Sequence, residues 1–299
     1  YSNNEKLSKK QFVSTYGSLI GLILLIIIIT VLRPRFISPA NLRNVFRNAS
    51  INGLLAIGMT FVVLTGGIDL SVGAIMGCAG MYSAQSVKGY PAIVAILIGL
   101  LVGLVFGVFN GFCIAYLKVP AFVGTLGALS IADSLKFLLT DAKPIPNLSD
   151  SFKTIGGGSF GFIPIPCVIM AVVLIICFTL LYKTRYGRYI YAVGGNRNAA
   201  HVSGINTKRI ICSVYILTGV LSALAGVIMT ARVTSGVTST GDGYETDAIA
   251  AVVVGGTSMA GGSGKIGGTI IGGLIIGVLN NGLNLLNVNS FWQYVVKGV

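Results

Sequence analysis

The chain has 299 residues, of which 54% are hydrophobic and only 10% are charged. An ordinary soluble domain has roughly 25% charged residues, so the composition excludes both a soluble globular protein and a disordered one. The formal net charge is +13, from 21 Lys and Arg against 8 Asp and Glu. These cations lie mainly between long apolar runs, which indicates membrane topology and anionic lipid as their partner, not nucleic acid.

Ten apolar stretches predict an all-α polytopic membrane protein of about ten transmembrane helices, because a span needs about 20 apolar residues. They cover residues 12–32, 45–65, 69–87, 91–117, 120–139, 164–182, 210–231, 246–260 and 267–286, and a last one opens near Phe291. We expect residues 1–299 to form a single transmembrane domain. Because the chain begins with Tyr1 and ends nine residues into the last stretch, we expect a truncated last helix and residues missing at both ends.

The first span, 12–32, follows three lysines, as the apolar part of a signal peptide does. Arg33 comes next in place of a small-residue cleavage site, so we interpret this stretch as a retained span. With a cytoplasmic N-terminus, eleven loop cations lie inside and nine outside, which is a weak bias. The segment 183–209, with six cations and no acid, decides the orientation. The cations of 33–47 oppose it.

Glycines recur every four residues in the stretch 91–117, at Gly99, Gly103, Gly107 and Gly111. Small residues at this spacing form a smooth ridge on one helix face and let another helix approach closely in lipid. We expect this ridge to pack against a second helix of the same chain. The alternatives are a seam between two copies or a contact that moves.

Two short stretches, 67–74 and 244–251, resemble each other, since each has an acid at the entrance of a span followed by small residues. In the predicted topology, the helices that follow them run in opposite directions. Inverted halves around a central pathway are a common plan for transporters. The two stretches therefore predict an inverted repeat.

The sequence contains stretches that resemble nucleotide-binding or metal-binding motifs, but the residues around them do not support these functions. Residues 262–267 match GxGxxG, but no βαβ unit is predicted around them, and Ile266 follows Lys265 where a phosphate loop requires Ser or Thr. His201 is the only histidine, which excludes a multi-histidine metal site, and the five cysteines lack metal or disulfide spacing. We expect no catalytic residue, no metal ligand and no cofactor on this chain.

Ionisable residues inside spans carry more weight, since a charge at the bilayer centre costs roughly 2.5–3.5 kcal/mol. Asp133 and Lys136 lie three residues apart on one helix face, so we expect them to neutralise each other. Asp69 and Asp247 lie at span entrances. For both we favour a role as helix N-terminal cap or dipole partner over direct substrate contact.

The remaining polarity inside the spans consists mostly of neutral hydroxyls and amides. Such groups suit a pathway for a polar, uncharged solute such as a sugar, and they do not suit an ion. The alternative is hydrogen bonding between helices, typically worth under about 1 kcal/mol for each bond. The residues that we assign to a translocation pathway are Asn52, Thr60, Thr65, Asp69, Ser71 and Asn110.

The segment 185–206 is the most specific region of the sequence. Its Asn198, Ala199 and Ala200, with Gly204 four residues beyond, resemble a degenerate form of the cytoplasmic coupling loop of ABC-importer permeases. The family it resembles is that of sugar permeases of the ribose, galactoside and arabinose type. Asn198 stands where the importer pattern has Glu, so a salt bridge from that position is not assumed.

Three further blocks, 56–73, 244–258 and 279–286, are similar to the ribose permease family, and the likeness covers about 35–299. The resemblance implies a type II ABC-importer-like permease in the bacterial inner membrane, with residues 183–209 as cytoplasmic coupling loop. It implies two copies around one pathway, cytoplasmic ATPases that bind ATP and Mg, and a periplasmic or lipid-anchored sugar-binding protein. It assigns the ATPase contact to Gly194, Gly195, Asn196, Asn198, Ala199, Ala200, Ser203, Gly204 and Ile205.

Ribose is the cargo that the resemblance favours. Galactoside, arabinose, xylose and other small polar solutes are the alternatives within the same class. Two rivals lie outside it, namely an ion-coupled secondary sugar carrier and a passive channel or non-transporting scaffold. An ionophore would stop the ion-coupled carrier, and flux through a channel would ignore ATP.

Overall fold

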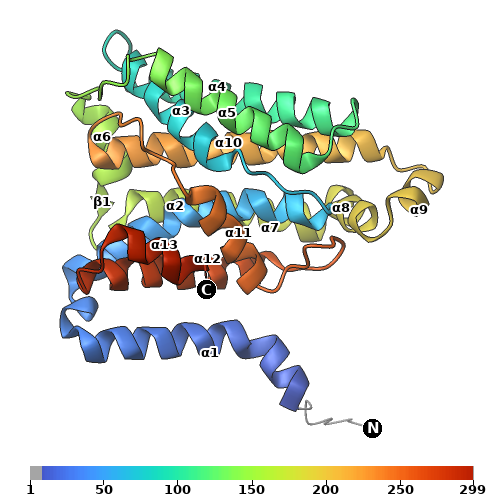
Figure 1. Cartoon of the computed structure of the whole chain (residues 1–299), viewed down its shortest axis with the longest axis horizontal. Helices are drawn as coiled ribbons and strands as arrows, with labels where there is room; N and C mark the ends of the chain where they lie inside the picture. Colours follow the sequence, from blue (N-terminus) through green and yellow to red (C-terminus); the bar gives the residue numbers. More distant parts are fainter. Residues whose placement is uncertain (1–8, 299) are drawn as a thin grey trace.

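The structure is a computed structural model, and it describes residues 9–298. Figure 1 shows a bundle of long helices that run side by side, with short helices at both ends. The elements are α1 (Lys9–Leu32), η1 (Pro34–Ile37), α2 (Pro39–Leu64), α3 (Val72–Ser86), α4 (Ala92–Ala115), α5 (Ala121–Leu138), α6 (Asp150–Gly157), β1 (Ser159–Phe160), β2 (Ile163–Pro164), α7 (Ile165–Lys183), α8 (Arg185–Gly195), α9 (Arg197–Val202), α10 (Thr207–Val233), α11 (Tyr244–Val254), α12 (Ile266–Leu285) and α13 (Ser290–Gly298). Apart from the antiparallel hairpin of β1 and β2, the described part of the chain has the helical architecture that the sequence predicts.

Six of the described helices are long and apolar enough to cross a membrane, namely α2, α4, α5, α7, α10 and α12. A seventh, α1, adds a shorter apolar stretch over Gly17–Leu32. The apolar windows of α2 and α10 are 89% and 61% buried, whereas those of α5 and α7 are 22% and 17% buried. The first two helices therefore form the centre of the bundle. The last two present Leu, Ile and Phe outward, as a surface in contact with lipid does.

The glycine ridge of α4 lies buried against α10. A Cβ atom at Gly103 would collide with the carbonyl oxygen of Gly219, and one at Gly107 would lie 2.7 Å from the Cα of Ile216. Only glycine lets the two backbones come this close, which is how helices associate in lipid. In this structure, the ridge contacts a helix of the same chain.

Two of the predicted spans, 69–87 and 246–260, contain helices that are shorter than a complete span. The helices at these places, α3 and α11, have 15 and 11 residues. At about 1.5 Å per residue, α11 reaches about 16 Å, against about 30 Å for the hydrocarbon core. The chain turns before each helix, through Gly66 with a φ of +76° and through Gly241 and Gly243 with +97° and +81°. Apolar composition does not reveal such turns inside a bundle.

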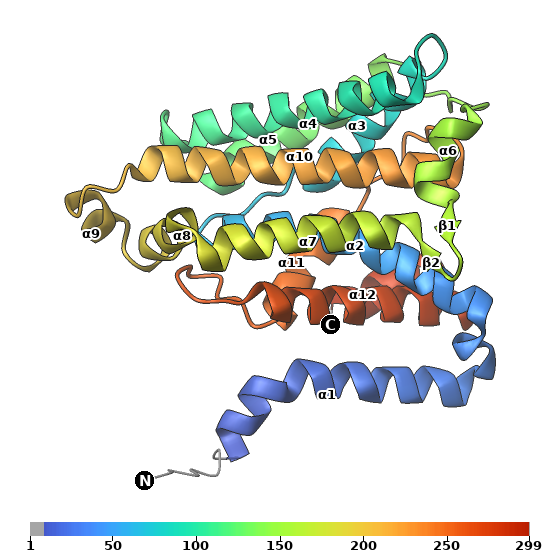
Figure 2. The same cartoon turned by 180° about the vertical axis from the view of Figure 1, so that it is seen from behind.

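The bundle has two ends that face opposite ways. We call the end that carries α8 and α9 the α9 end, and the one that carries α6 and the hairpin the α6 end (Figure 1 and Figure 2). The helix α2 runs from the α6 end to the α9 end, and α10 runs back. Each is followed by a connection and a short helix, so α3 and α11 begin inside the bundle and run in opposite directions.

Candidate functional site

The α9 end is built around α8, which joins α7 to the projecting α9. The hydroxyls of Tyr186 and Ser213 form a hydrogen bond of 2.8 Å, and the hydroxyl of Tyr191 donates to the carbonyl of Gly264 at 2.8 Å. Burial raises the pKa of both tyrosine hydroxyls above the ordinary value, so both stay protonated at neutral pH. These bonds fix α8 to α10 and to the turn before α12.

Beyond α8, the six-residue helix α9 stands out from the long helices (Figure 1). Asn196 caps it, because its Oδ1 accepts a hydrogen bond from the backbone N–H of Ala199 at 2.9 Å. The chain leaves α9 through Gly204, whose φ of +84° is a conformation that glycine adopts without strain. Val202 is 87% exposed, although it is apolar. The segment therefore offers a shaped, partly apolar tip.

The nine residues assigned to an ATPase contact divide by exposure. Those that are exposed are Gly195, Asn196, Asn198, Ala199, Ser203 and Gly204. The half-buried Gly194 presses against the end of α2, because a Cβ atom there would collide with the carbonyl oxygen of Leu64. Ala200 is buried and Ile205 is half-buried. These three positions shape the segment from within, and the other six are open to a partner.

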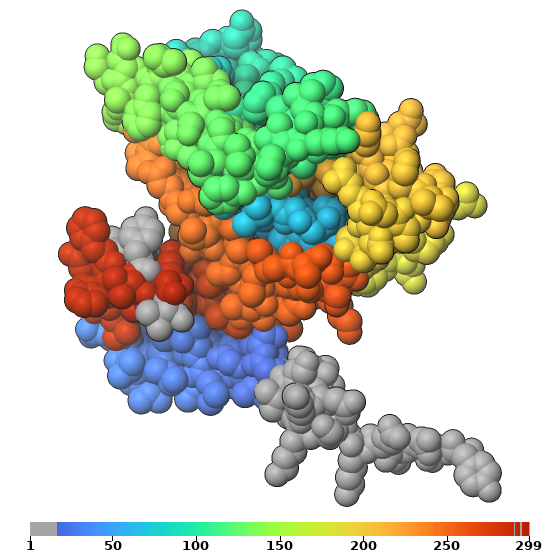
Figure 3. Space-filling model, turned by 45° about the vertical axis from the view of Figure 1, so that its right-hand side comes forward, coloured from blue at the N-terminus to red at the C-terminus, as the bar shows by residue number. Residues whose placement is uncertain are grey.

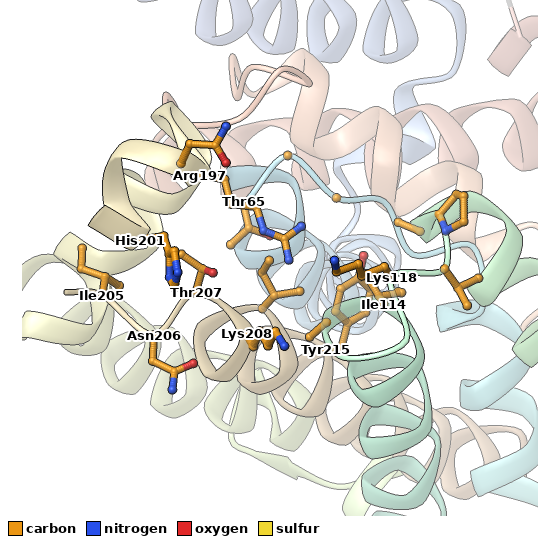
Figure 4. A pocket seen from close by; sticks show the side chains of 18 of the residues that line it. Thr65, Ile114, Lys118, Arg197, His201, Ile205, Asn206, Thr207, Lys208 and Tyr215 are labelled. Atoms are coloured by element: carbon orange, nitrogen blue, oxygen red, sulfur yellow. The ribbon is translucent and has the colours of Figure 1, made fainter. Parts of the chain in front are cut away.

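A cavity of about 1000 Å³ lies beside α9, between the start of α10, the α4–α5 connection and the end of α2. Its basic lining residues are Lys118, Arg197, His201 and Lys208, and no acid stands among its described lining residues. Thr65 and Tyr215 also line it (Figure 4). Figure 3 shows the hollow between the green α4–α5 segment and the yellow α8–α9 segment, with the light-blue α2–α3 connection at its floor.

Next to this cavity, the α2–α3 connection holds a buried polar cluster. The Oδ1 of Asp69 accepts hydrogen bonds from the backbone N–H of Ser71 at 2.9 Å and from its hydroxyl at 2.5 Å. The Nδ2 of Asn110 donates to the hydroxyl oxygen of Ser71 at 2.8 Å. All three side chains are buried. Asp69 caps the turn before α3, but the N-cap residue of the helix is Ser71, so the prediction that Asp69 is the helix N-cap is wrong.

The six residues assigned to a translocation pathway do not line one common cavity. Thr65 lines the large cavity, and Asn52 lines a second cavity of about 210 Å³. Thr60 is buried between α2 and α12, where its hydroxyl forms a hydrogen bond of 2.8 Å with that of Thr269. The other three form the buried cluster just described. In this structure, Thr60, Asp69, Ser71 and Asn110 form hydrogen bonds within the protein. Hydrogen bonding between segments was the alternative to a translocation pathway in the sequence analysis.

Two ion pairs connect segments that lie far apart in sequence. The Nζ of Lys136 lies 2.8 Å from Oδ1 of Asp133 and 3.1 Å from Oδ1 of Asp242. The predicted pairing of Asp133 with Lys136 is thus confirmed, and Asp242 joins it from the α10–α11 connection. The Nζ of Lys297 lies 3.0 Å from Oδ1 of Asp247. No local pattern in the sequence predicts the contact of Asp242 with Lys136 or of Asp247 with Lys297, because only the fold brings these segments together.

The GxGxxG-like stretch 262–267 covers the end of the turn between α11 and α12 and the first two residues of α12, so the turn that its sequence context predicts is present. Gly262 has a φ of +69°, and its backbone N–H donates to the carbonyl of Leu64 at 2.9 Å. The turn thus packs on the end of α2. Within residues 9–298, no group of three or more His, Cys, Asp or Glu could hold a metal ion. The five cysteines are free thiols.

These features define the class: a multi-pass helical membrane protein with polar cavities between its helices and a short exposed helix at one end. Residues 41–299 match the family described as "Branched-chain amino acid transport system / permease component". The chain belongs to this family of transport-system permeases.

Individual relatives of the chain are also transport permeases. The ribose import permease protein RbsC of Bacillus subtilis is 48% identical over 286 residues, which cover 95% of this chain and 89% of that protein. RbsC of Escherichia coli K12 is 44% identical, with coverages of 97% and 92%. The D-allose transport system permease protein AlsC of Escherichia coli K12 is 39% identical, with coverages of 96% and 89%. No solved structure matches. The resemblance to ribose-type permeases is confirmed.

Proposed function

We propose that this chain is the permease subunit of an ABC importer that moves a monosaccharide, ribose in the first place, into the cytoplasm. The observation that carries the proposal is the identity of 43–48% to ribose import permeases along nearly the whole chain. The neutral amide of Asn52 at the smaller cavity supports an uncharged polar cargo. The chain itself is not an enzyme, and ATP with Mg binds to separate ATPase subunits.

The coupling segment is 183–209, and its α9 seats in a cleft of the ATPase. Three observations support this assignment. Val202 leaves an apolar side chain exposed at the tip. Asn196 caps α9, and the Oδ1 of Asn206 accepts from the N–H of Arg209 at 3.1 Å, so both flanks of the tip are fixed. Tyr186 and Tyr191 connect α8 to the rest of the bundle. A push on α9 therefore reaches α10 and the α11–α12 turn together.

The α9 end faces the cytoplasm in this proposal, with the N-terminus on the same side, in the inner membrane of a bacterium. The basic residues Lys118, Arg197 and Lys208 at that end support this orientation. The sugar-binding protein docks at the α6 end, where the exposed Phe160 and Ile163 of the hairpin support a protein contact. Lipid surrounds the outward faces of α4, α5 and α7.

We also propose that α2 with α3 and α10 with α11 are the cores of two inverted halves, in a fold of about ten membrane helices. The support is that each long helix is followed by a connection and a short helix, in opposite directions. A second copy of the chain completes the pathway, for which the sequence-assigned Asn52, Thr60, Thr65, Asp69, Ser71 and Asn110 stay our assignment. The assembled importer thus holds two permeases and two ATPases.

The test reconstitutes this chain with its ATPase and binding protein in proteoliposomes and measures ribose uptake. We expect uptake that needs ATP and persists with an ionophore. Gly204→Val places a β-branched residue at a φ of +84°, which forces the exit of α9 into another conformation. Uptake then falls by about tenfold or more, since about 1.4 kcal/mol is a factor of ten, and sugar binding to the soluble partner stays intact.

The matched control is Gly21→Val, because Gly21 has open space around its Cβ position and no positive φ. Normal uptake by Gly204→Val would contradict the coupling assignment. Uptake by vesicles that carry this chain alone, or its abolition by an ionophore, would favour an ion-coupled carrier and contradict the proposed function. A screen of xylose, allose, galactose and arabinose in the same vesicles then ranks the cargo.

A further inference from the structure

The second cavity, of about 210 Å³, lies between α2, α11, α12 and α13. Three of these helices each contribute two polar side chains four residues apart, so that each pair shares one helix face. The pairs are Asn48 with Asn52, Asn280 with Asn284, and Gln293 with Lys297. Polar residues inside a membrane bundle mark substrate pathways or contacts between helices. The hydrogen bonds at the cavity decide between the two.

The charged groups at this cavity are paired with one another. The Oδ2 of Asp247 accepts hydrogen bonds from Nδ2 of Asn280 at 3.0 Å and from Nζ of Lys297 at 3.1 Å. Asp242 accepts from Nζ of Lys136 at 3.1 Å. Each described carboxylate of the lining is therefore compensated by a lysine. A cation would find no spare negative charge, and an uncharged ligand fits better.

Two amide oxygens at the cavity have no hydrogen-bond partner among the described residues, namely Oδ1 of Asn52 and Oδ1 of Asn280. Asn52 is only 4% exposed, and a buried polar atom without a partner raises the free energy of the folded state. Because both atoms are acceptors, the molecule that satisfies them must donate hydrogen bonds.

Asn281, the next residue along α12, shows how an asparagine that only joins helices behaves. Its amide forms a reciprocal pair with that of Asn41 on α2, with N···O distances of 2.9 and 3.0 Å. Asn280 lies on a different face of α12 and keeps its Oδ1 unpaired. Contact between helices therefore explains Asn281 and does not explain the amides at the cavity.

The volume limits the ligand. A water molecule takes about 30 Å³ of the liquid, so the cavity has the volume of about seven waters. It is smaller than the roughly 300–1,000 Å³ of pockets that hold drug-sized ligands, and it thus suits one small ring molecule. Hydroxyls donate and accept hydrogen bonds, which matches amide side chains that carry both kinds of atom.

We propose that this cavity is a transient binding site for a single uncharged monosaccharide, whose hydroxyls donate hydrogen bonds to the amide oxygens of Asn52 and Asn280. The inference rests on the proposed function and names where the sugar is held within the membrane. Asn280 is also bonded to Asp247, and through it to Lys297. Sugar binding therefore engages α2, α11, α12 and α13 at once.

The first test measures D-ribose uptake by the complete importer in proteoliposomes. Asn52→Ala and Asn280→Ala each remove one acceptor, and we expect uptake at low ribose concentration to fall by about tenfold. The matched control is Asn44→Ala, since Asn44 is exposed, lies on α2 two turns before Asn52 and does not line the cavity.

The second test does not depend on transport. Asn284→Cys is introduced into the chain after removal of its five native cysteines, and a water-soluble thiol reagent labels it. We expect D-ribose to slow this labelling, and to leave unchanged the labelling of Asn44→Cys, whose site lies outside the cavity. Leucine serves as the comparison ligand, because the family model is described by amino-acid transport.

The proposal would be overturned if both alanine variants took up ribose at the wild-type rate and D-ribose did not slow the labelling of Asn284→Cys. Protection by leucine in place of D-ribose would overturn it too. An alanine variant that fails to fold leaves the labelling result to decide. If the wild-type importer shows no ATP-dependent ribose uptake, the proposed function fails, and the labelling result again decides the cavity separately.

Discussion

The connection 65–71 before α3 and the connection 234–243 before α11 use the same parts in different ways. Each lets a long helix turn inside the bundle through a glycine with positive φ, and each leads to an acid near the start of a short helix. Asp69 is fully buried and hydrogen-bonded to Ser71. Asp247 is paired with Lys297 at the edge of a cavity. Asp69 therefore stabilises the buried connection between α2 and α3, whereas Asp247 borders a polar cavity.

The two regions touch each other through backbone. The carbonyl of Gly241 lies against Gly73 on α3, and that of Thr240 lies against Gly77, so closely that a Cβ atom at either glycine would collide with it. Since neither α3 nor α11 spans the membrane alone, each depends on this contact and on α10 for its position. The buried α2–α3 connection therefore supports the α10–α11 connection, which borders the polar cavity.

Gly77→Val should have the largest effect, because it forces the two regions apart. The obstacle is the backbone carbonyl of Thr240, which has no room to move, so we expect a loss at the upper end of the roughly 1–3 kcal/mol typical of overpacking, or more. The apparent melting temperature of the purified chain in detergent measures it. Gly127→Val is the control, since the Cβ position of Gly127 meets open space. Equal melting temperatures for the two variants would contradict the contact.

Asp69→Ala should come next, because it removes the acceptor for the backbone N–H and the hydroxyl of Ser71 in a fully buried place. A buried donor without a partner costs about 1–3 kcal/mol. Asp69→Asn keeps an Oδ1 acceptor and should lose much less stability by the same melting measurement. If the Ala and Asn variants melt together, the cap does not stabilise the α2–α3 connection.

Asp247→Asn should be milder, with a loss of about 1.5 kcal/mol, the lower end of the range for hydrogen bonds to charged groups. Lys297 is 21% exposed, so water compensates part of the lost ion pair. A double-mutant cycle with Lys297→Gln isolates the interaction. We expect a positive coupling energy for this pair, and a coupling of zero would show that the two side chains do not stabilise α11.

Lys136→Met should have the smallest effect, about 1 kcal/mol or less. The side chains of Asp133 and Asp242 are 36% and 57% exposed, so neither carboxylate is enclosed by the protein when the lysine is removed. Lys136→Arg retains the charge and should melt like the wild type. A loss for Lys136→Met as large as that for Asp69→Ala would mean that this ion pair, and not the backbone contact at Gly77, joins the two regions.

Local patterns in the sequence sufficed for much of the fold. Stretches of 18 or more residues with high mean hydropathy marked the long helices, and the four-residue glycine spacing marked the α4 face that contacts α10. Because Ile266 follows Lys265 and no βαβ unit surrounds it, the sequence predicted a turn at this position and not a nucleotide-binding loop. The spacing of Asp133 and Lys136 was enough to predict their pair. These features depend on residues near each other in the chain.

The candidate sites were less accessible to sequence reasoning. Of the six residues assigned to a pathway, Asn52 and Thr65 line the two cavities described above, and the other four are buried in hydrogen-bonded contacts. Asn280 and Asn281 are adjacent and chemically identical, yet one lies at a cavity and the other pairs with Asn41. A rotation of about 100° between successive helix residues separates them, and its consequence depends on which neighbours the fold supplies.

The sequence by itself determined that the chain is a membrane protein, which residues form its long helices and to which family of permeases it is related. Hydropathy and family motifs are properties of contiguous residues. Only the tertiary structure decided that α3 and α11 stop short of a full span, that Asp247 meets Lys297 and that four helices contribute to a cavity lined by amides. Those outcomes depend on contacts between segments tens to hundreds of residues apart, which packing in three dimensions selects.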